Sequence, residues 1–392
     1  MRGTERLPEP LGNAVRQLYS TVRRHTVAVR RRTAMPQRPF LPEAPFRLLV
    51  GPANQAGQGW AWARAAERTS SAVAAQVLTV RRNEFGYDSD YVISSDQYRN
   101  PRWQQEQERY VTTHFSHVLI EALRPILGNR YGSDCRGDLR FLSRHGISTA
   151  LVVHGSEIRL PSRHAQREKW SPFAVVDDFT GRLERQARRN GAIVGDFAGP
   201  KFVSTPDLLV DVPGAHWLPV VVEPEQWATE APVLRRLRPV VIHAPSQLRL
   251  KGTACIDRAM ERLDASGVIE YRRIAGVPHA RMPSVLSEAD IVIDQVLMGL
   301  YGVAACEAMA AERVVVSYVG SDVRGYVRRE TGRSLPIMEA TPETISDVVI
   351  DLVTNRAGAR EAAAEGVSFV REIHDGRVAG LTLAAWLGES PA

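Results

Sequence analysis

Residues 291–310 carry the pattern that decides the fold: Ile291-Val-Ile-Asp-Gln295-Val-Leu-Met-Gly-Leu300-Tyr-Gly-Val-Ala-Ala305-Cys-Glu-Ala-Met-Ala310. A short apolar run, a loop with two glycines and an Ala-rich helical segment form the strand–loop–helix unit of a doubly wound α/β sheet. Backbone N–H groups around Gly302 and Val303 suit phosphate oxygens, and Glu307 one turn further along can accept hydrogen bonds from ribose hydroxyls. The alternative is an ordinary buried turn, with Glu307 as a favourable charge near a helix N-terminus.

The alternation of strand and helix extends in both directions from this unit. In the series that contains this unit we expect strands at 240–243, 269–274, 291–293 and 314–318, and helices at 253–263, 281–288, 304–311, 341–354 and 358–373. An earlier series has strands at 46–50, 74–81, 149–153, 201–205 and 217–222, with helices at 60–69 and 118–127. The break near 223–238 predicts two doubly wound, Rossmann-like α/β domains facing across a cleft, where ligands bind beyond the carboxyl ends of the strands.

The second series contains a further candidate phosphate contact. In the segment 243–253, Arg249 and Lys251 precede Gly252 in a loop between a strand and a helix. Two cations and the N–H groups of a helix start can bind a diphosphate there. Taken alone, a solvated Arg-x-Lys loop without a ligand is the more common explanation of such a motif.

Together these segments resemble family 4 glycosyltransferases, whose GT-B fold consists of two facing Rossmann-like domains. Lys251-Gly252 is similar to the family's Lys-Gly at the donor diphosphate, and the segment from Leu300 to Ala310 resembles its donor turn, whose final Glu (here Glu307) binds the ribose. His154-Gly155 resembles the family's histidine at a strand end of the first domain, which faces the reacting sugar. The resemblance covers about residues 46–387.

The resemblance implies a division of the chain and a set of site residues. Residues 1–45 would form a basic arm and Pro-rich linker, 46–225 the acceptor-side domain, 235–375 the nucleotide-sugar-binding domain, and 376–392 a helix able to cross back to the first domain. The implied reaction is retaining glycosyl transfer that uses no metal or other cofactor. The residues expected to take part are His154, Asp294 and Lys251 in catalysis, Arg249, Lys251, Gly252, Tyr301, Gly302, Val303 and Glu307 in donor binding, and Gly57, Gly59, Glu157 and Arg159 on the acceptor side.

Some of these residues have structural explanations that need no ligand. His154 is explained at least as well as a strand-end histidine satisfied by local backbone, and Gly57 and Gly59 as glycines that tighten a turn. Two positions also depart from the family pattern: Gly299 stands where the family carries a first Glu that contacts the donor sugar, and Pro245-Ser246 where it carries an Arg. Asp294 or Gln295 could supply the missing carboxylate or polar contact. The departure at Gly299 keeps open a second interpretation, a catalytically silent GT-B protein that binds a nucleotide sugar or serves as an assembly subunit.

Composition narrows the class of protein. Hydrophobic residues make up 44% and charged residues 24% of the 392 residues, as in globular proteins. The three cysteines (Cys135, Cys255, Cys306) are scattered, which predicts neither a disulfide framework nor a zinc site. No apolar run approaches the roughly eighteen residues of a membrane-spanning helix, and no secretory signal pattern is found at the N-terminus. We therefore expect a cytoplasmic protein.

The basic charge is concentrated in the arm. Residues 1–45 contain nine Arg and three Glu and so account for the whole net charge of +6, which disfavours nucleic acid as a partner of the neutral body. Apolar residues at 11, 15, 18, 19 and 22 recur at helical spacing, so the arm is a candidate for peripheral contact with the inner face of a membrane, or for a helix that packs on the body or frays. The function that we expect is transfer of a sugar from a nucleotide-sugar donor to a glycan or lipid-linked acceptor in cell-surface polysaccharide or glycolipid synthesis.

Overall fold

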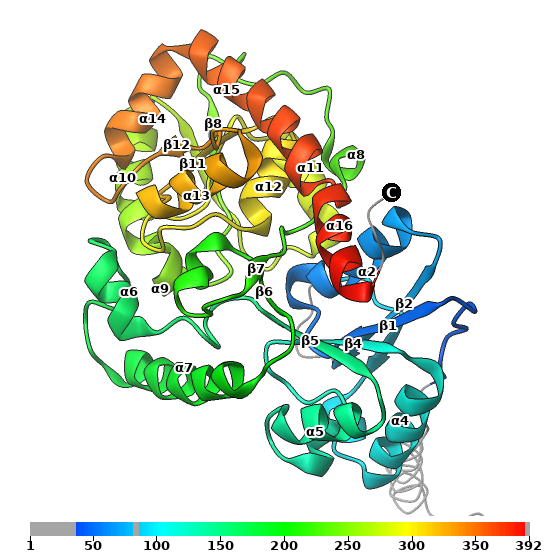
Figure 1. Ribbon diagram of the computed structural model, residues 1–392. Coiled ribbons are helices and arrows are strands. Elements are labelled where there is room, and N and C mark those ends of the chain that lie inside the picture. The colour runs from blue at the N-terminus through cyan, green and yellow to red at the C-terminus, as the bar shows by residue number, and fades with distance from the viewer. Residues whose placement is uncertain (1–36, 81–85, 389–392) are drawn as a thin grey trace, which may run out of the picture.

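The computed structural model describes residues 37–80 and 86–388, so the helix expected within residues 11–22 lies outside the described residues. Two parallel sheets organise the described chain (Figure 1). We call residues 37–222 the first half and residues 223–388 the second half.

The first half contains a seven-stranded sheet with the order β3-β2-β1-β4-β5-β6-β7, in which every pair is parallel. Strands in such a sheet are covered on both faces and therefore form continuous apolar runs, as Leu48–Val50 and Ala150–Val153 do. The strands are β1 Phe46–Gly51, β2 Val73–Val80, β3 Tyr91–Ile93, β4 His117–Glu121, β5 Ser148–Val153, β6 Lys201–Val203 and β7 His216–Trp217. The helices are α2 Gln58–Thr69, α3 Ser95–Tyr98, α4 Pro101–His114, α5 Arg136–Arg144, α6 Pro161–Arg167 and α7 Asp178–Asp196, with 3₁₀ turns at Gln55–Gly57, Gly128–Tyr131 and Pro206–Val210.

Two hydrophobic layers enclose this sheet. On one face Trp62 of α2 packs with Leu48, Val77 and Leu383, so that the C-terminal helix α16 (Arg377–Leu387) lies beside α2 on the first sheet. On the other face residues of α4, α5 and α7, among them Trp103, pack against the alternate residues of the strands. The last helix of the chain therefore completes the core of the first half (Figure 1).

The second half contains a five-stranded parallel sheet with the order β12-β11-β10-β8-β9. Its strands are β8 Val240–His243, β9 Glu270–Arg273, β10 Ile291–Ile293, β11 Val314–Ser317 and β12 Met338–Glu339. Its helices are α8 Pro224–Trp227, α9 Leu248–Lys251, α10 Thr253–Ala265, α11 Met282–Ser287 after a 3₁₀ turn at His279–Arg281, α12 Val303–Ala310, α13 Ser321–Thr331, α14 Ile345–Thr354 and α15 Arg356–Phe369, which continues as a π-helical turn at Val370–His374.

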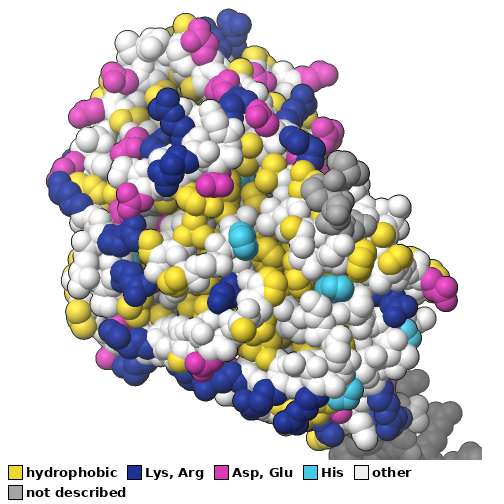
Figure 2. Space-filling model, in the orientation of Figure 1, with side chains coloured by type: hydrophobic (Ala, Val, Ile, Leu, Met, Phe, Trp, Pro, Cys, Tyr) yellow, Lys and Arg dark blue, Asp and Glu magenta, His cyan; other side chains and the backbone are white. Residues whose placement is uncertain are grey.

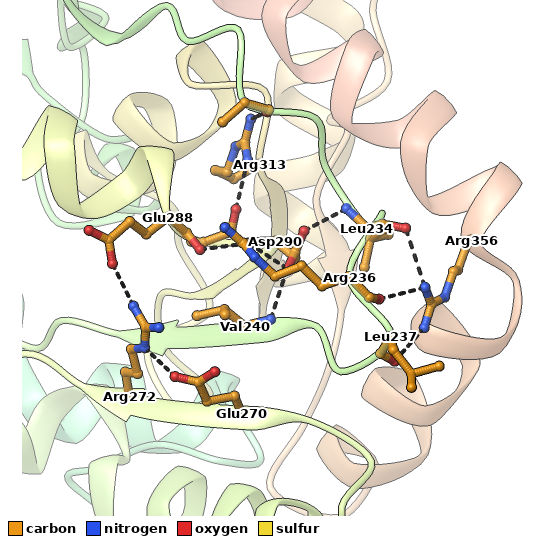
Figure 3. A network of polar contacts seen from close by, with 12 residues as sticks. Leu234, Arg236, Leu237, Val240, Glu270, Arg272, Glu288, Asp290, Arg313 and Arg356 are labelled. Atoms are coloured by element: carbon orange, nitrogen blue, oxygen red, sulfur yellow. Dashed lines mark hydrogen bonds and ion pairs between the residues drawn. The ribbon is translucent and has the colours of Figure 1, made fainter.

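A polar network fixes the segment that leads into this sheet (Figure 3). Asp290, fully buried at the start of β10, accepts hydrogen bonds from the backbone N–H groups of Leu234 (2.6 Å) and Val240 (2.8 Å) and from Arg236 (3.0 Å). The buried guanidinium of Arg313 donates to the carbonyl groups of Ala231, Ala289 and Ala311, each at 2.7 Å. Asp290 thus lies at the amino end of its strand, away from the edge of the sheet where ligands bind, and its role is structural.

Two expected elements differ from the structure: the strand expected at 217–222 is limited to the two residues of β7, and the helix expected at 118–127 is absent. Residues 118–127 do not form a helix: His117–Glu121 is strand β4, which lies between β1 and β5 in the middle of the first sheet. A short apolar run such as Val118-Leu-Ile120 fits a buried strand and a buried helix equally well by pattern alone, and pairing with two neighbouring strands decides it. Ala122 and Leu123 follow with φ of 54° and 56°, a left-handed conformation that ends the strand abruptly.

The exposed surface of the first half has a basic edge. Arg182, Arg185, Arg188 and Arg189 are exposed on α7, and Lys and Arg side chains follow the lower edge of the molecule where Figure 1 places this helix (Figure 2). In the described part of the chain no helix is long and apolar enough to cross a membrane.

Candidate active site

A cleft of about 610 Å³ lies between the two halves at the carboxyl ends of their strands. Residues 55, 56 and 58 of the β1–α2 connection and His154–Ser156 after β5 line it on one side. The second half contributes the loops after β8, β9 and β10 and the start of α12. The predicted site residues in its wall are His154, Arg159, Lys251, Asp294, Gly302, Val303 and Glu307.

Lys251 and Asp294 form an ion pair in this wall. Lys251 ends α9, and Asp294 follows β10, so the two loops that carry them meet at the same edge of the sheet. The side chain of Asp294 is only 3% exposed, and Lys251 is its sole charged partner among the described residues. The ion pair therefore places the ammonium of Lys251 at the edge of the cleft, where an anionic ligand could meet it.

The start of α12 is a second feature of the same wall. Gly302 caps the helix and Val303 is its first residue, so the first N–H groups of α12 have no partner within the helix. Val303, Ala304 and Gly302 all line the cleft. The N–H groups and the dipole of a helix start both favour negative charge, so this part of the wall suits an anion.

Glu307, one turn into α12, presents its carboxylate to the cleft. Burial raises its pKa, and the hydrogen bond and charge of His279 counteract that rise. His279 Nε2 lies 2.8 Å from Glu307 Oε1, and its ring packs against those of Tyr87 (centroids 4.7 Å apart) and Trp227 (5.4 Å). His279 and Tyr87 both line the cleft, and Tyr87 was not predicted, since it stands in a segment without a motif.

Gln295 lines the cleft, but its side-chain amide is occupied by the backbone of the following loop. Its Oε1 accepts the N–H groups of Leu297 (2.8 Å) and Met298 (2.6 Å), and its Nε2 donates to the carbonyl of Leu300 (2.8 Å). The side chain therefore holds the loop 296–300 in shape, which leaves Asp294 as the carboxylate that follows β10 in the wall.

Gly299 is covered by a carboxylate from the other half. Its φ is 65°, and a Cβ atom built on it would lie 2.8 Å from Cδ of Glu168, which follows α6. The hydroxyl of Tyr318 donates to Glu168 Oε2 at 2.6 Å. Burial raises the pKa of Glu168. Glu168 was missed because it is distant in sequence from the turn that it covers.

Three predicted donor residues lie outside the cleft wall. Arg249 pairs with Asp177 at 2.5 Å and its guanidinium lies over the ring of Phe179, so it joins α9 to the start of α7. Tyr301 is 2% exposed and its hydroxyl lies 3.3 Å from His374 Nε2. Gly252, with φ of 75°, ends α9 against Val296 and Leu297. All three contact other parts of the protein and do not line the cleft.

Three of the four predicted acceptor-side residues also lie outside the wall. Glu157 accepts the N–H groups of His154 (2.6 Å) and Gly155 (3.0 Å) and so shapes the turn after β5. Gly57 packs against the ring of Tyr87, and Gly59 against the carboxylate of Glu121. Arg159 does line the cleft, where it binds Asp207 through Nε (3.0 Å) and Nη2 (2.6 Å).

Metal-ligating side chains do not gather in this part of the molecule: in residues 37–80 and 86–388 no group of three or more His, Cys, Asp or Glu could hold an ion.

Comparison with known proteins identifies the fold. No protein-family model matches the sequence, and no curated protein matches it. Among solved structures, the sucrose-phosphate synthase of Thermosynechococcus elongatus superposes with a TM-score of 0.60 at 12% identity, over 88% of this chain and 98% of that one. HepE of Anabaena, crystallised with UDP and glucose, gives 0.58 at 11% identity, over 88% and 99%. WaaG, a glycosyltransferase involved in lipopolysaccharide biosynthesis, gives 0.51 at 12% identity, over 88% and 100%.

These likenesses cover 88% of this chain and 98–100% of the others and establish the fold class: two Rossmann-like α/β units in the GT-B arrangement. At 11–12% identity these likenesses show the fold alone. The chemistry of the site must therefore be argued from the residues of this chain.

Proposed function

We propose that the protein is a nucleotide-sugar-dependent glycosyltransferase that transfers a sugar with retention to a glycan or lipid-linked acceptor, in cell-surface polysaccharide or glycolipid synthesis. The observation that carries the proposal is the wall formed by Lys251, the open start of α12 and the carboxylate of Glu307, with His154 also lining the cleft. The HepE structures with UDP and with UDP-glucose support a nucleotide-sugar donor.

Each part of the wall suits one part of such a donor. The diphosphate would bind the N–H groups of Val303 and Ala304 and the ammonium of Lys251. The ribose hydroxyls would donate to Glu307, and the loop 274–277 after β9 borders the space for the base. When the sugar–phosphate bond breaks, negative charge develops on the diphosphate, and the same N–H groups and Lys251 would stabilise it. We propose that this cationic set replaces a divalent metal.

His154 and Asp294 would act on the sugar. His154 would orient a hydroxyl of the donor sugar or the acceptor, and Asp294, released from Lys251 as that cation turns to the diphosphate, would face the sugar. Arg159 would meet the acceptor from the first half. The arm of residues 1–45 would bring the enzyme to an anionic membrane surface.

A thermal-shift screen with UDP-, GDP- and ADP-sugars tests donor binding. One donor should stabilise the wild type, Lys251→Ala and Glu307→Gln should each lose that stabilisation, and the exposed Lys169→Ala should keep it. Activity that persists in excess EDTA would support the metal-free step. Equal stabilisation of Lys251→Ala and wild type would exclude this wall as the donor site.

A catalytically silent nucleotide-sugar-binding or assembly subunit is the second candidate, because Gly299 carries no carboxylate of its own toward the donor turn. It predicts the same thermal shifts with neither transfer nor donor hydrolysis, whereas the enzyme predicts turnover that Asp294→Asn abolishes.

A further inference from the structure

Glu121 and His154 form a buried carboxylate–imidazole pair at the wall of the cleft. Glu121 ends β4 and has no exposed surface, and β4 pairs with β5, the strand that precedes His154. Glu121 Oε1 lies 3.3 Å from His154 Nε2, and Glu121 Oε2 accepts the N–H of Asn54 at 2.8 Å. The contact is an ion pair: among the described residues neither Oε1 nor Nε2 meets the geometry of a hydrogen bond with any partner, although both atoms are buried.

The surroundings hold both groups in place. The ring of Trp62 stacks on that of His154, with centroids 5.5 Å apart and planes 15° from parallel. Trp62 is itself fixed by a hydrogen bond from its indole N–H to the carbonyl of Pro219 at 2.8 Å. On the opposite side Gly59 packs so closely on the carboxylate that a Cβ atom there would lie 2.9 Å from Glu121 Oε2.

Burying a carboxylate with so few partners does not stabilise the folded protein. Removing a carboxylate from water costs several kcal/mol, and well-packed apolar residues in place of a buried ion pair are often neutral or more stable. The backbone around the carboxylate is strained as well: Asn54 and Ala56 on one side, and Ala122 and Leu123 on the other, all have φ between 44° and 56°. Strain of this kind persists mainly where function requires it.

We propose that Glu121 is a positioning residue that sets the orientation and the charge of His154, so that the ring donates a hydrogen bond from its second nitrogen to a hydroxyl of the ligand in the cleft. The identity of that ligand rests on the proposed function, but the pairing of Glu121 with His154 does not. The carboxylate, 3.3 Å from Nε2, favours the tautomer and the charge state in which that nitrogen keeps its proton. Nδ1 has no hydrogen-bond partner among the described residues, which leaves it for a ligand.

The electrostatics agree with this geometry. Burial lowers the pKa of His154, while the hydrogen bond and charge of Glu121, and then the charge of Glu157, raise it, and the net result is a raised pKa. Arg159, whose Nη1 lies 3.1 Å from the position of a Cβ on Gly155, is the cation that faces the same turn. Without the charge of Glu121, burial would dominate and the ring would be neutral at neutral pH.

Titration of the histidine rings of the full-length protein by NMR tests the proposal. In the wild type we expect His154 to titrate above the ordinary value of about 6.5 and to carry its proton on Nε2 when neutral. In Glu121→Gln, which keeps the size and the acceptor for Asn54, the pKa should fall by at least about one unit. Asp138→Asn is the matched control: Asp138 is equally buried and accepts the N–H groups of Ile126 and Leu127, so its loss disturbs the fold but leaves the titration of His154 unchanged.

Catalysis gives a second readout. The alkaline limb of the pH profile for donor turnover should move to lower pH in Glu121→Gln by the same amount as the titration of His154. An unchanged pKa in Glu121→Gln overturns the proposal, and so does a wild-type His154 that titrates below its ordinary value, a result that needs no variant. If no donor is turned over, the proposed function fails while the NMR titration still decides the role of Glu121.

Discussion

The Glu307 carboxylate lies in the cleft wall with one oxygen bonded to His279, and its second oxygen is left for a ligand. At the scale of a residue, Glu307→Gln keeps the shape and removes the charge. A hydrogen bond to a charged group contributes about 1.5–3 kcal/mol, so donor affinity should fall about tenfold to a hundredfold. Isothermal titration with the donor chosen by the thermal screen measures it. Glu330→Gln, an exposed change on α13, should leave affinity intact, and an equal loss in both variants would contradict the assignment.

His279 controls the ionisation of the same carboxylate. Burial raises the pKa of Glu307 and His279 lowers it, so His279→Ala should raise that pKa further. The ionised acceptor is present above the folded-state pKa and is lost as the pH falls through it. Donor affinity in His279→Ala should therefore fall off at a higher pH than in the wild type. Donor affinity measured between about pH 5 and 8 checks this, with His145→Ala at an exposed position as the control. If the acidic limb of the affinity profile stays at the same pH in His279→Ala, the prediction is refuted.

At the scale of the element, the contact of α16 with α2 depends on Gly380. A Cβ atom on Gly380 would lie 1.9 Å from Oγ1 of Thr69 and 2.7 Å from the carbonyl oxygen of Ala65. Gly380→Ala should therefore destabilise the protein by about 1–3 kcal/mol, as overpacking does. Gly191→Ala on α7 has open space around it and should be neutral or stabilising by up to about 1 kcal/mol. Urea unfolding of both variants measures the difference, and equal midpoints would show that the two helices separate easily.

The segment before β8 depends on the hydrogen bonds of Arg313, which is 1% exposed and donates to three carbonyl groups. Arg313→Met keeps the length of the side chain but leaves those carbonyls without donors. We expect a loss of about 3 kcal/mol or more in the free energy of unfolding. Arg328→Met, exposed on α13, should change it by less than about 0.5 kcal/mol. A small effect at Arg313 would mean that water replaces the guanidinium.

Element by element, the sequence predicts the second half well, because its central strands β8, β10 and β11 are short apolar runs separated by glycine-containing loops. The expected strand at 240–243 and helix at 253–263 lie on β8 and α10. The helix expected at 118–127 failed because β4 is recognisable only by its two neighbours. The same error hid Glu121: read as the end of a strand, it would have stood beside His154. Contacts between distant segments, such as Glu168 over Gly299, leave no local pattern at all.

At the scale of the whole molecule, polar contacts join the two halves. Arg249 binds Asp177, Arg167 binds Asp322 at 2.5 Å, and Glu168 accepts the hydroxyl of Tyr318. The Glu168 contact is the most buried of these, because Gly299 and Gly320 both leave room for its carboxylate. The space at Gly299 is thus filled by a carboxylate that belongs to the other half.

This arrangement predicts that Gly299→Glu separates the halves instead of improving the site. The new side chain would meet Glu168 at a distance where two carboxylates repel, at a φ of 65°. We expect a larger radius of gyration in X-ray scattering and weaker donor binding, both partly reversed by adding Glu168→Ala. Gly214→Glu, at a φ of 74° with open space around it, carries the same backbone strain without the repulsion and should stay compact. Higher turnover in Gly299→Glu would instead mean that the cleft accepts a carboxylate from the turn itself, and Glu168 would then be a dispensable contact between the halves.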